Sequence, residues 1–240
     1  MTEMTPRITT EPHTPGRAGR MNWLRAGVLG ADDGIVSVAG IVVGVAGATS
    51  SRGAIFTAGM AGLVAGAVSM ALGEYVSVSS QRDSEHAMID LEKQEIAESP
   101  AGEELELAAI YRTKGLTATT ASTVAAAELM AHDALAAHLD AELNLDPDDT
   151  ASPAQAAAAS AFAFTLGALL PLLAMMLSPE SMRVPVTVVA VLLALGATGA
   201  ASARIGGSRP RIAVLRIVLG GAAGLAFTYA VGHFFGTAIG

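Results

Sequence analysis

Five apolar segments, each 20–25 residues long, constrain the fold of this chain more than any other feature of its sequence. They cover residues 26–50, 54–76, 157–178, 184–203 and 217–239. About 20 apolar residues in a helix span a hydrocarbon core of about 30 Å. Inside lipid the backbone must satisfy its own hydrogen bonds, which a helix does within one segment. The sequence therefore predicts an all-α membrane protein with five transmembrane helices.

The composition supports this prediction and narrows the chemistry. Apolar residues make up 52% of the chain and the mean hydropathy is +0.50, which is high for a soluble domain. Cysteine is absent from the sequence, which excludes disulfides, zinc–thiolate sites and iron–sulfur clusters. Any metal ligands are therefore carboxylates, His or Met. Residues 1–21 lack the apolar core of a signal peptide, and we expect them to form a disordered arm.

The arginines indicate the orientation of the predicted helices. Four precede the first apolar segment and four separate the fourth from the fifth, while the other short loops hold only Arg52 and Arg183. With five spans, the two arginine-rich clusters fall on one side of the membrane, which the positive-inside rule makes cytosolic. We therefore expect a cytosolic N-terminus, a cytosolic segment after the second span, and a C-terminus outside or in a lumen.

An acidic insert, residues 79–156, separates two predicted membrane regions, residues 22–78 and 157–240. The insert holds sixteen acidic and four basic residues, a net charge of −12, while the rest of the chain sums to +4. This segregation argues against nucleic acid as a partner and favours cations.

The insert is expected to contain three helices. Neither Gly nor Pro occurs between residues 73 and 100, so the second span is expected to continue as one helix to about Glu98. A second helix begins with Ser99 as its N-cap and Pro100 in its first position, and ends before Gly115. A third helix runs from near Thr117 to before residue 147, and a polar linker follows over residues 146–153.

Two adjacent carboxylates, Asp32 and Asp33, interrupt the first span. A carboxylate at the centre of a membrane helix costs about 2.5–3.5 kcal/mol on insertion scales, so such groups usually line a pathway or find a partner. Adjacent helical residues point about 100° apart, so one pore does not accommodate both. The alternative is that both reach water at the cytosolic end, since Arg25 is only two turns away.

Met70 and Glu74 lie on one face of the second span at i, i+4 spacing. A thioether and a carboxylate on one stripe suit a borderline divalent ion such as Fe²⁺. An equal alternative is that Met70 fills a gap in an apolar interface and that Glu74 is an interfacial carboxylate.

Six residues of the insert are candidate metal ligands. Two pairs of glutamates are each spaced at i, i+3, an arrangement that repels in an isolated helix and that a bridging cation would explain. His138 and Glu142 share a face of the third helix at i, i+4. The candidates are Glu92, Glu95, Glu103, Glu106, His138 and Glu142. The alternative to a metal site is that these side chains form an acidic helix face exposed to water. A second point is that the insert lacks the Glu-x-x-His signature of di-iron carboxylate proteins, which counts against a di-iron oxidase.

Three pairs of glycines lie four residues apart in the predicted spans, at positions 40 and 44, 62 and 66, and 220 and 224. Small residues at this spacing let membrane helices approach closely. The spacing predicts close helix packing, either within one subunit or between two.

Three segments of this chain resemble the vacuolar iron transporter family. They are VLGADDGIVS in the first span, AGAVSMALGEYVSVSSQRD in the second, and LEKQEIAESPAGEELE in the insert. The resemblance extends from about Asn22 to the C-terminus. It implies five spans, a cytosolic helical metal-binding domain after the second span, a homodimer with its pore at the interface, and proton-coupled export of Fe²⁺ from the cytosol.

The resemblance also implies roles for single residues. The family's first-span aspartate corresponds to Asp33, which favours it over Asp32, and its second-span methionine corresponds to Met70. Its domain glutamates correspond to Glu92, Glu95, Glu103, Glu106 and Glu142.

This chain departs from the family pattern at three places. Plant members carry a pore glutamate where this chain has Gly62, and they have glycine where this chain has Glu74. A methionine pair of the family corresponds to His138 and Leu139 here. Oxygen and nitrogen ligands suit harder ions, so Mn²⁺ becomes a candidate beside Fe²⁺.

We therefore predict a homodimeric transporter, not an enzyme, that moves Fe²⁺ out of the cytosol in exchange for protons, with Mn²⁺ or Zn²⁺ as further candidate ions. The insert would capture the ion, and Asp33, Met70 and Glu74 would pass it through the bilayer. The resemblance to bacterial members places the protein in a bacterial inner or plasma membrane. The competing hypothesis is a membrane-anchored metal buffer or sensor without transport.

Overall fold

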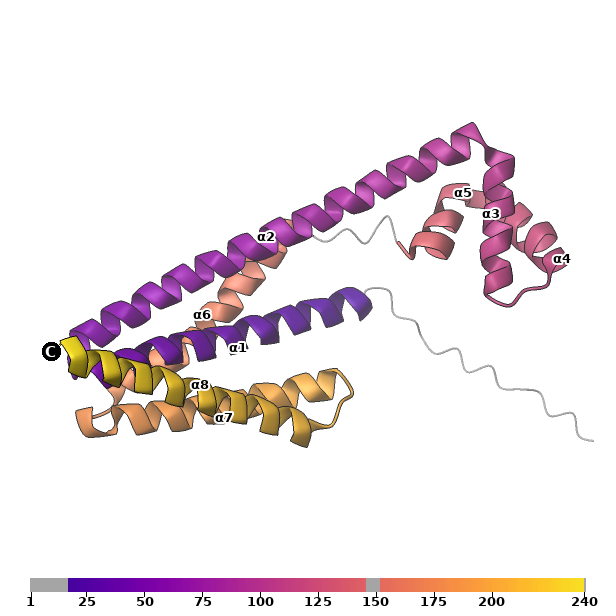
Figure 1. Cartoon of the computed structure of the whole chain (residues 1–240). Helices are drawn as coiled ribbons and strands as arrows, with labels where there is room; N and C mark the ends of the chain where they lie inside the picture. The colour runs from indigo at the N-terminus through magenta and orange to yellow at the C-terminus, as the bar shows by residue number, and fades with distance from the viewer. Residues whose placement is uncertain (1–16, 146–151, 240) are drawn as a thin grey trace, which may run out of the picture. The chain divides into compact units, whose positions relative to one another are not determined.

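The computed structural model describes residues 17–145 and 152–239, and every regular element within these ranges is a helix (Figure 1). Five helices are long and apolar enough to cross a membrane. They are α1 (Arg17–Ala48), α2 (Arg52–Glu98), α6 (Pro153–Leu177), α7 (Arg183–Ile205) and α8 (Pro210–Ile239). The all-α class and the five candidate spans are confirmed.

Two predicted irregular segments fall largely outside the described residues. The structure does not describe residues 1–16 of the predicted arm or residues 146–151 of the predicted linker. α1 begins at Arg17, so residues 17–21 are helical rather than part of an arm. The short 3₁₀ turn η3 (Glu180–Met182) joins α6 to α7.

The described chain divides into two compact units. We call residues up to 70 together with those from 159 onward the membrane unit, and residues 71–158 the insert unit. α2 runs through both as one unbroken helix of 47 residues (Figure 1), a length of about 70 Å at 1.5 Å per residue. The predicted continuation of the second span to Glu98 is confirmed, and this helix exceeds the thickness of a hydrocarbon core.

The membrane unit is built around α1, which packs against both α7 and α8. One buried face of α1 meets side chains of α2, α6, α7 and α8 in a single apolar core. Its largest fully buried members are Val38, Val42, Val43, Ile55, Phe164, Met175, Val191 and Leu195. Leu and Phe side chains on the outer helix faces are exposed, as expected where lipid is the solvent.

α1 and α6 cross so closely that each contributes a glycine to the crossing. A Cβ atom added to Gly34 would overlap the carbonyl oxygen of Phe164, and one added to Gly167 would overlap the carbonyl oxygen of Ala31. Any larger residue would push the two backbones apart, which is why small residues are enriched at such contacts.

The three predicted glycine pairs have different surroundings. The first pair faces Thr228 of α8, and the second pair faces Ile41 and the ring of Phe164, so both pairs serve packing within the chain. In contrast, Cβ atoms added to Gly220 and Gly224 would meet nothing within 4 Å in the described chain.

The insert unit continues from α2 into α3 (Pro100–Thr113), whose bounds are those predicted. Ser99 occupies the N-cap position, but its side chain makes no capping hydrogen bond, which corrects the predicted role of its hydroxyl. The backbone carbonyl of Ser99 instead accepts from the amides of Gly102 and Glu103. Gly115 follows with φ of +103°, a conformation that glycine adopts without strain, and it ends the helix.

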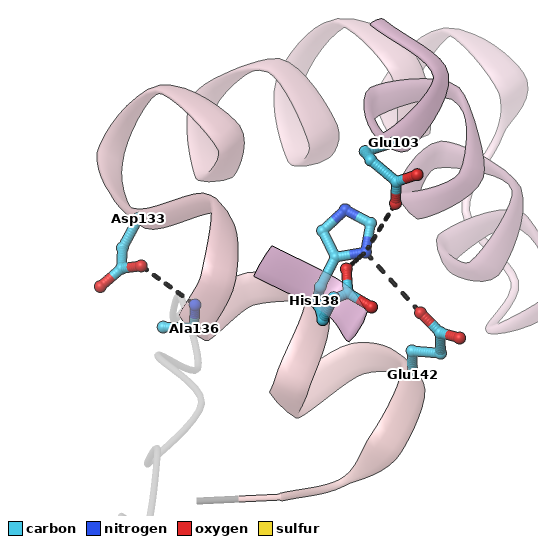
Figure 2. A network of polar contacts seen from close by, with 6 residues as sticks. Glu103, Asp133, Ala136, His138 and Glu142 are labelled. Atoms are coloured by element: carbon cyan, nitrogen blue, oxygen red, sulfur yellow. Dashed lines mark hydrogen bonds and ion pairs between the residues drawn. The ribbon is translucent and has the colours of Figure 1, made fainter. Parts of the chain in front are cut away.

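The predicted third helix is not one helix. It comprises α4 (Ala118–Thr120), the π-helix η1 (Ala121–Ala126), α5 (Ala127–His138) and the π-helix η2 (Leu139–Leu143). Asp133 has φ −152° and ψ 92°, and its carboxylate accepts from the amide of Ala136 at 3.0 Å (Figure 2). The Asp133 side chain thereby caps a new helical start, a local hydrogen bond that competes with continuing the helix.

Small residues dominate the core of the insert unit. Leu107, Ala108, Ala121, Ala126, Ala137 and Ala141 form one buried cluster. Alanines allow the helices to approach closely, so long polar side chains at the edges of this core are brought within reach of one another.

Candidate metal centre

One buried histidine lies at the centre of the acidic side chains of the insert unit. His138 is the last residue of α5, and its side chain is fully buried, with 0% exposed. Its Nδ1 atom lies 3.0 Å from Oε1 of Glu92, 3.7 Å from Oε2 of Glu103 and 3.7 Å from Oε2 of Glu142 (Figure 2). Three separate helical segments thus direct carboxylates to one imidazole nitrogen.

Local structure explains how these four side chains meet. Glu92 lies near the end of α2, and Glu103 lies in the first turn of α3, just after the Ser99 turn that reverses the chain. The break at Asp133 starts the segment that carries His138. Glu142 follows on η2, one turn later. π-helical turns of this kind are frequent at functional sites.

The burial of the carboxylates is unusual for a surface acidic cluster. Glu92 is 4% exposed and Glu103 8% exposed, whereas the Glu142 side chain is 35% exposed. Glu92 Oε1 and both ring nitrogens of His138 are buried and find no hydrogen-bond partner in the described part of the chain, because the 3.0 Å approach lacks hydrogen-bond geometry. Buried polar atoms are normally paired, so these atoms point to a ligand.

The spacing of the donors fits a metal ion. Ligand atoms of Glu92, Glu103 and His138 all lie within 4.8 Å of one another. A metal with bonds of about 2.0–2.2 Å holds neighbouring ligands about 2.8–3.6 Å apart. The distances from His138 Nδ1 to the three carboxylates are close to this range, so a small contraction would complete a site with one nitrogen and three oxygen donors.

The electrostatics of the cluster favour a cation. Burial raises the pKa of Glu92, and the charges of Glu142, Glu103 and Glu95 raise it further, against the opposing effect of His138. The pKa of Glu103 is also raised, first by burial and then by the charge of Glu106, again opposed by His138. A divalent ion would relieve both the burial cost and the repulsion.

The structure separates the six predicted ligands of the insert into two groups. Glu92, Glu103, His138 and Glu142 converge, whereas Glu95 and Glu106 are exposed. The charges of Glu95 and Glu106 nevertheless act on the buried carboxylates. These two residues therefore lie at the rim of the cluster.

The four predicted pore residues do not form a comparable cluster. Asp33 is exposed and accepts a hydrogen bond from the Ser37 hydroxyl at 2.7 Å. Met70 packs against the apolar core of the membrane unit, and Glu74 is partly exposed on α2. Within the described residues, His, Asp and Glu gather at ligand distance in threes only in the insert unit.

Asp32 differs from its neighbour in a way the sequence did not reveal. It is partly buried beside Thr198 of α7, and its Oδ1 atom is buried without a hydrogen-bond partner among the described residues. Thr198 lies 166 positions later in the chain, so no local pattern connects the two. Ser37 could have been found, because it follows Asp33 at i, i+4 spacing.

Comparison with known proteins assigns the chain to a family. The model of the VIT family matches residues 24–233. The chain belongs to the VIT family. A vacuolar iron transporter of Acanthamoeba castellanii is 41% identical over 230 residues, which cover 95% of this chain and 84% of the relative.

Two plant proteins show the same relationship to this VIT family member. Vacuolar iron transporter homolog 1 of Oryza sativa is 37% identical over 92% of this chain and 80% of its own length. Vacuolar iron transporter homolog 2 of Arabidopsis thaliana is 34% identical over 95% of this chain and 92% of its own length. The family match covers the converging site and all four predicted pore residues, so the resemblance to vacuolar iron transporters is confirmed.

Proposed function

We propose that this integral membrane protein transports a divalent metal ion, with Fe²⁺ as its main substrate, and that the insert unit captures the ion. Membership in the VIT family and the names of the similar proteins support iron transport. The observation that carries the proposal is the convergence of three carboxylates on buried His138 Nδ1, where neither this nitrogen nor Glu92 Oε1 has a hydrogen-bond partner among the described residues.

The donor set supports Fe²⁺ and limits the alternatives. Imidazole suits Fe²⁺ and Zn²⁺, while carboxylates also accept Mn²⁺ and the harder ions. One nitrogen with three oxygens therefore admits Fe²⁺, Mn²⁺ and Zn²⁺, and it is the names of the similar proteins that favour Fe²⁺ among them. Carboxylates outnumber the single imidazole, and an ion bound mainly by oxygen is exchanged more readily than one held by thiolates.

We assign transfer of the ion through the bilayer to Asp33, Met70 and Glu74. Asp32, the neighbour of Asp33 in the sequence, is a further candidate. Asp33 is exposed on the surface of a single chain, so a pathway that includes it requires a second surface. We propose that a homodimer supplies that surface, with Asp33 and Met70 of both copies at the interface. A Cβ atom added to Gly220 or Gly224 on α8 would meet nothing within 4 Å in the described chain. These two glycines therefore leave room for the close approach of a second chain.

We infer the direction of transport from the cytosolic side that the sequence predicts for the insert. The arginine distribution favours a cytosolic insert, so an ion captured there moves out of the cytosol. Carboxylates that bind either a proton or a metal make exchange for protons a consistent mechanism. The relatives above are named for the vacuole, and a bacterial plasma membrane stays a prediction.

Flux into proteoliposomes tests the proposal. Fe²⁺, Mn²⁺, Co²⁺ and Zn²⁺ are offered side by side, with and without a pH gradient, to the wild-type protein and to Asp33→Ala. We expect Fe²⁺ uptake that is accelerated by an opposing proton gradient and lost in Asp33→Ala, while metal binding to the insert is retained. Binding without flux in both proteins would leave the membrane-anchored buffer or sensor as the function.

A further inference from the structure

We infer that Lys114 is a positioning residue for the metal centre, which acts through the backbone of the segment that carries Glu142. This inference rests on the proposed function, because it concerns the same site. Lys114 follows the last residue of α3, and its ammonium nitrogen donates to the carbonyl oxygen of Ala141 at 2.9 Å. Ala141 immediately precedes Glu142 on η2.

The carbonyl that Lys114 contacts lies in the final turn of its helix. η2 ends at Leu143, and its C-cap Asn144 has φ of +51°. The amides of Asn144 and Leu145 both donate to the carbonyl of Leu139. The last carbonyls of a helix have no partner within the helix and need one from elsewhere. Lys114, 27 residues earlier in the chain, supplies a donor to the carbonyl of Ala141. Its positive charge also suits the negative end of a helix.

The ammonium is held in place from a second direction. Lys114 Nζ lies over the ring of Tyr111, 5.3 Å from the ring centroid, a distance at which a cation is attracted to an aromatic face. Tyr111 and Lys114 are both at the end of α3, three positions apart. The side chain therefore bridges the end of α3 to η2 in a defined position.

This bridge controls the least constrained of the four donors. The side chains of Glu92, Glu103 and His138 are 4%, 10% and 0% exposed, so surrounding atoms fix them. The Glu142 side chain is 35% exposed, more than any of the other three. Its position depends on the backbone of η2. Because α3 also carries Glu103, the contact from Lys114 to Ala141 sets the distance between two of the donors.

Metal binding and amide exchange in the full-length protein test this role. Lys114→Met removes the donor and the charge, whereas Lys114→Arg retains both. Lys93→Met is the matched control, because within the described part of the chain Lys93 pairs with exposed Asp90 alone, at 3.2 Å on the surface of α2. We expect Lys114→Met to lower Zn²⁺ and Fe²⁺ affinity about tenfold, as loss of an outer-shell contact does, with Lys114→Arg close to wild type and Lys93→Met unchanged.

A double-mutant cycle separates positioning from a general effect of charge. In a Glu142→Gln background, Lys114→Met should change affinity less than twofold, since the donor that it positions has been weakened. An equal tenfold loss in that background would show that Lys114 acts independently of Glu142 and would overturn the inference.

Hydrogen exchange of the metal-free protein gives a readout that does not depend on metal binding. We expect faster exchange at residues 139–145 in Lys114→Met, with rates in Lys93→Met equal to wild type. Unchanged exchange would overturn the inference even if the wild-type protein bound no metal. Absence of metal binding in the wild type with increased exchange in Lys114→Met would instead contradict the proposed function and limit Lys114 to a structural contact.

Discussion

Replacing Glu92 by glutamine should stabilise the metal-free insert unit and weaken the stabilisation that the unit gains from metal. Glu92 is buried, and burial together with neighbouring carboxylates raises its pKa. Glutamine has nearly the same shape but no charge. The substitution therefore removes repulsion from the metal-free site while it removes an anionic ligand from the metal-bound one.

The magnitude follows from the distance between the carboxylates. Ligand oxygens of Glu92 and Glu103 lie within 4.8 Å of each other, and two unit charges at that distance repel by about 3.5 kcal/mol at an effective dielectric constant of 20. Partial protonation relieves some of this repulsion. We therefore expect Glu92→Gln to raise the free energy of unfolding of the metal-free insert unit by about 1–3 kcal/mol.

Metal reduces or removes the stability advantage of the variant. At a metal concentration 100 times the wild-type Kd, binding stabilises the wild-type protein by about 2.7 kcal/mol. If the affinity of Glu92→Gln is lower by about 10–100-fold, the same concentration stabilises the variant by only about 0.4–1.4 kcal/mol. We therefore expect Glu92→Gln to have a higher free energy of unfolding than the wild type when a chelator removes metal, and to gain less stability than the wild type when metal is added.

Amide exchange at Leu107 and Ala108, which are buried in the core of the insert unit, measures both quantities in the full-length protein. Glu95→Gln is the matched control, since Glu95 is exposed one turn away on the same helix, and we expect it to change stability by less than about 0.5 kcal/mol. Faster exchange in metal-free Glu92→Gln, or a response to metal equal to wild type, would refute the convergence of charge at this site.

Three further predictions concern pH, the imidazole and helix packing. Burial and neighbouring carboxylates raise the pKa of Glu92 and Glu103. The contribution of these two side chains to the stability of the metal-free insert unit should therefore be largest below pH 4.5 and fall as pH rises through their folded pKa values. Melts in chelator, compared between the wild type and a Glu92→Gln, Glu103→Gln variant, would show this loss, and Zn²⁺ should reverse it. His138→Ala should lower Zn²⁺ affinity at least about tenfold in calorimetry, while exposed His132→Ala should not; equal affinities would remove the nitrogen ligand from the site. Gly167→Leu should destabilise the membrane unit by at least about 1–3 kcal/mol in thermal unfolding, because the new side chain would meet the backbone of Ala31. Gly73→Ala, on α2 outside this unit and with open space around it, should not lower the melting temperature.

Sequence patterns were sufficient where a local rule fixes the structure. The absence of Gly and Pro before Pro100 predicted one helix to Glu98, and Pro100 with Gly115 bounded α3. The spacing of His138 and Glu142 at i, i+4 marked them as a pair before their contact was known. Each of these predictions depends on residues within a few positions of one another.

Tertiary packing decided what the patterns could not. The i, i+3 spacing predicted the same role for Glu92 and Glu95, but the Glu92 side chain is buried in the insert unit and the Glu95 side chain is exposed. Nothing in the sequence distinguished Asp133 from the other acidic residues of the predicted third helix. In the structure its side chain caps the helical segment that begins after the kink and carries His138. Thr198 reaches Asp32 only because α7 packs against α1. Such choices depend on partners distant in sequence.

The uneven exposure of the four donors bears on whether the site stores metal or passes it on. A closed structural metal site holds its ion with buried ligands on all sides. Here three donors are buried, but the Glu142 side chain is 35% exposed, so one edge of the site is open to water. An ion can exchange a water for Glu142 and leave by that edge without the unit unfolding. Release on the timescale of transport requires such an edge, and a storage site would gain affinity by burying it. Stopped-flow chelation should therefore remove metal faster from the wild type than from a variant in which Glu142 is held by added packing on η2.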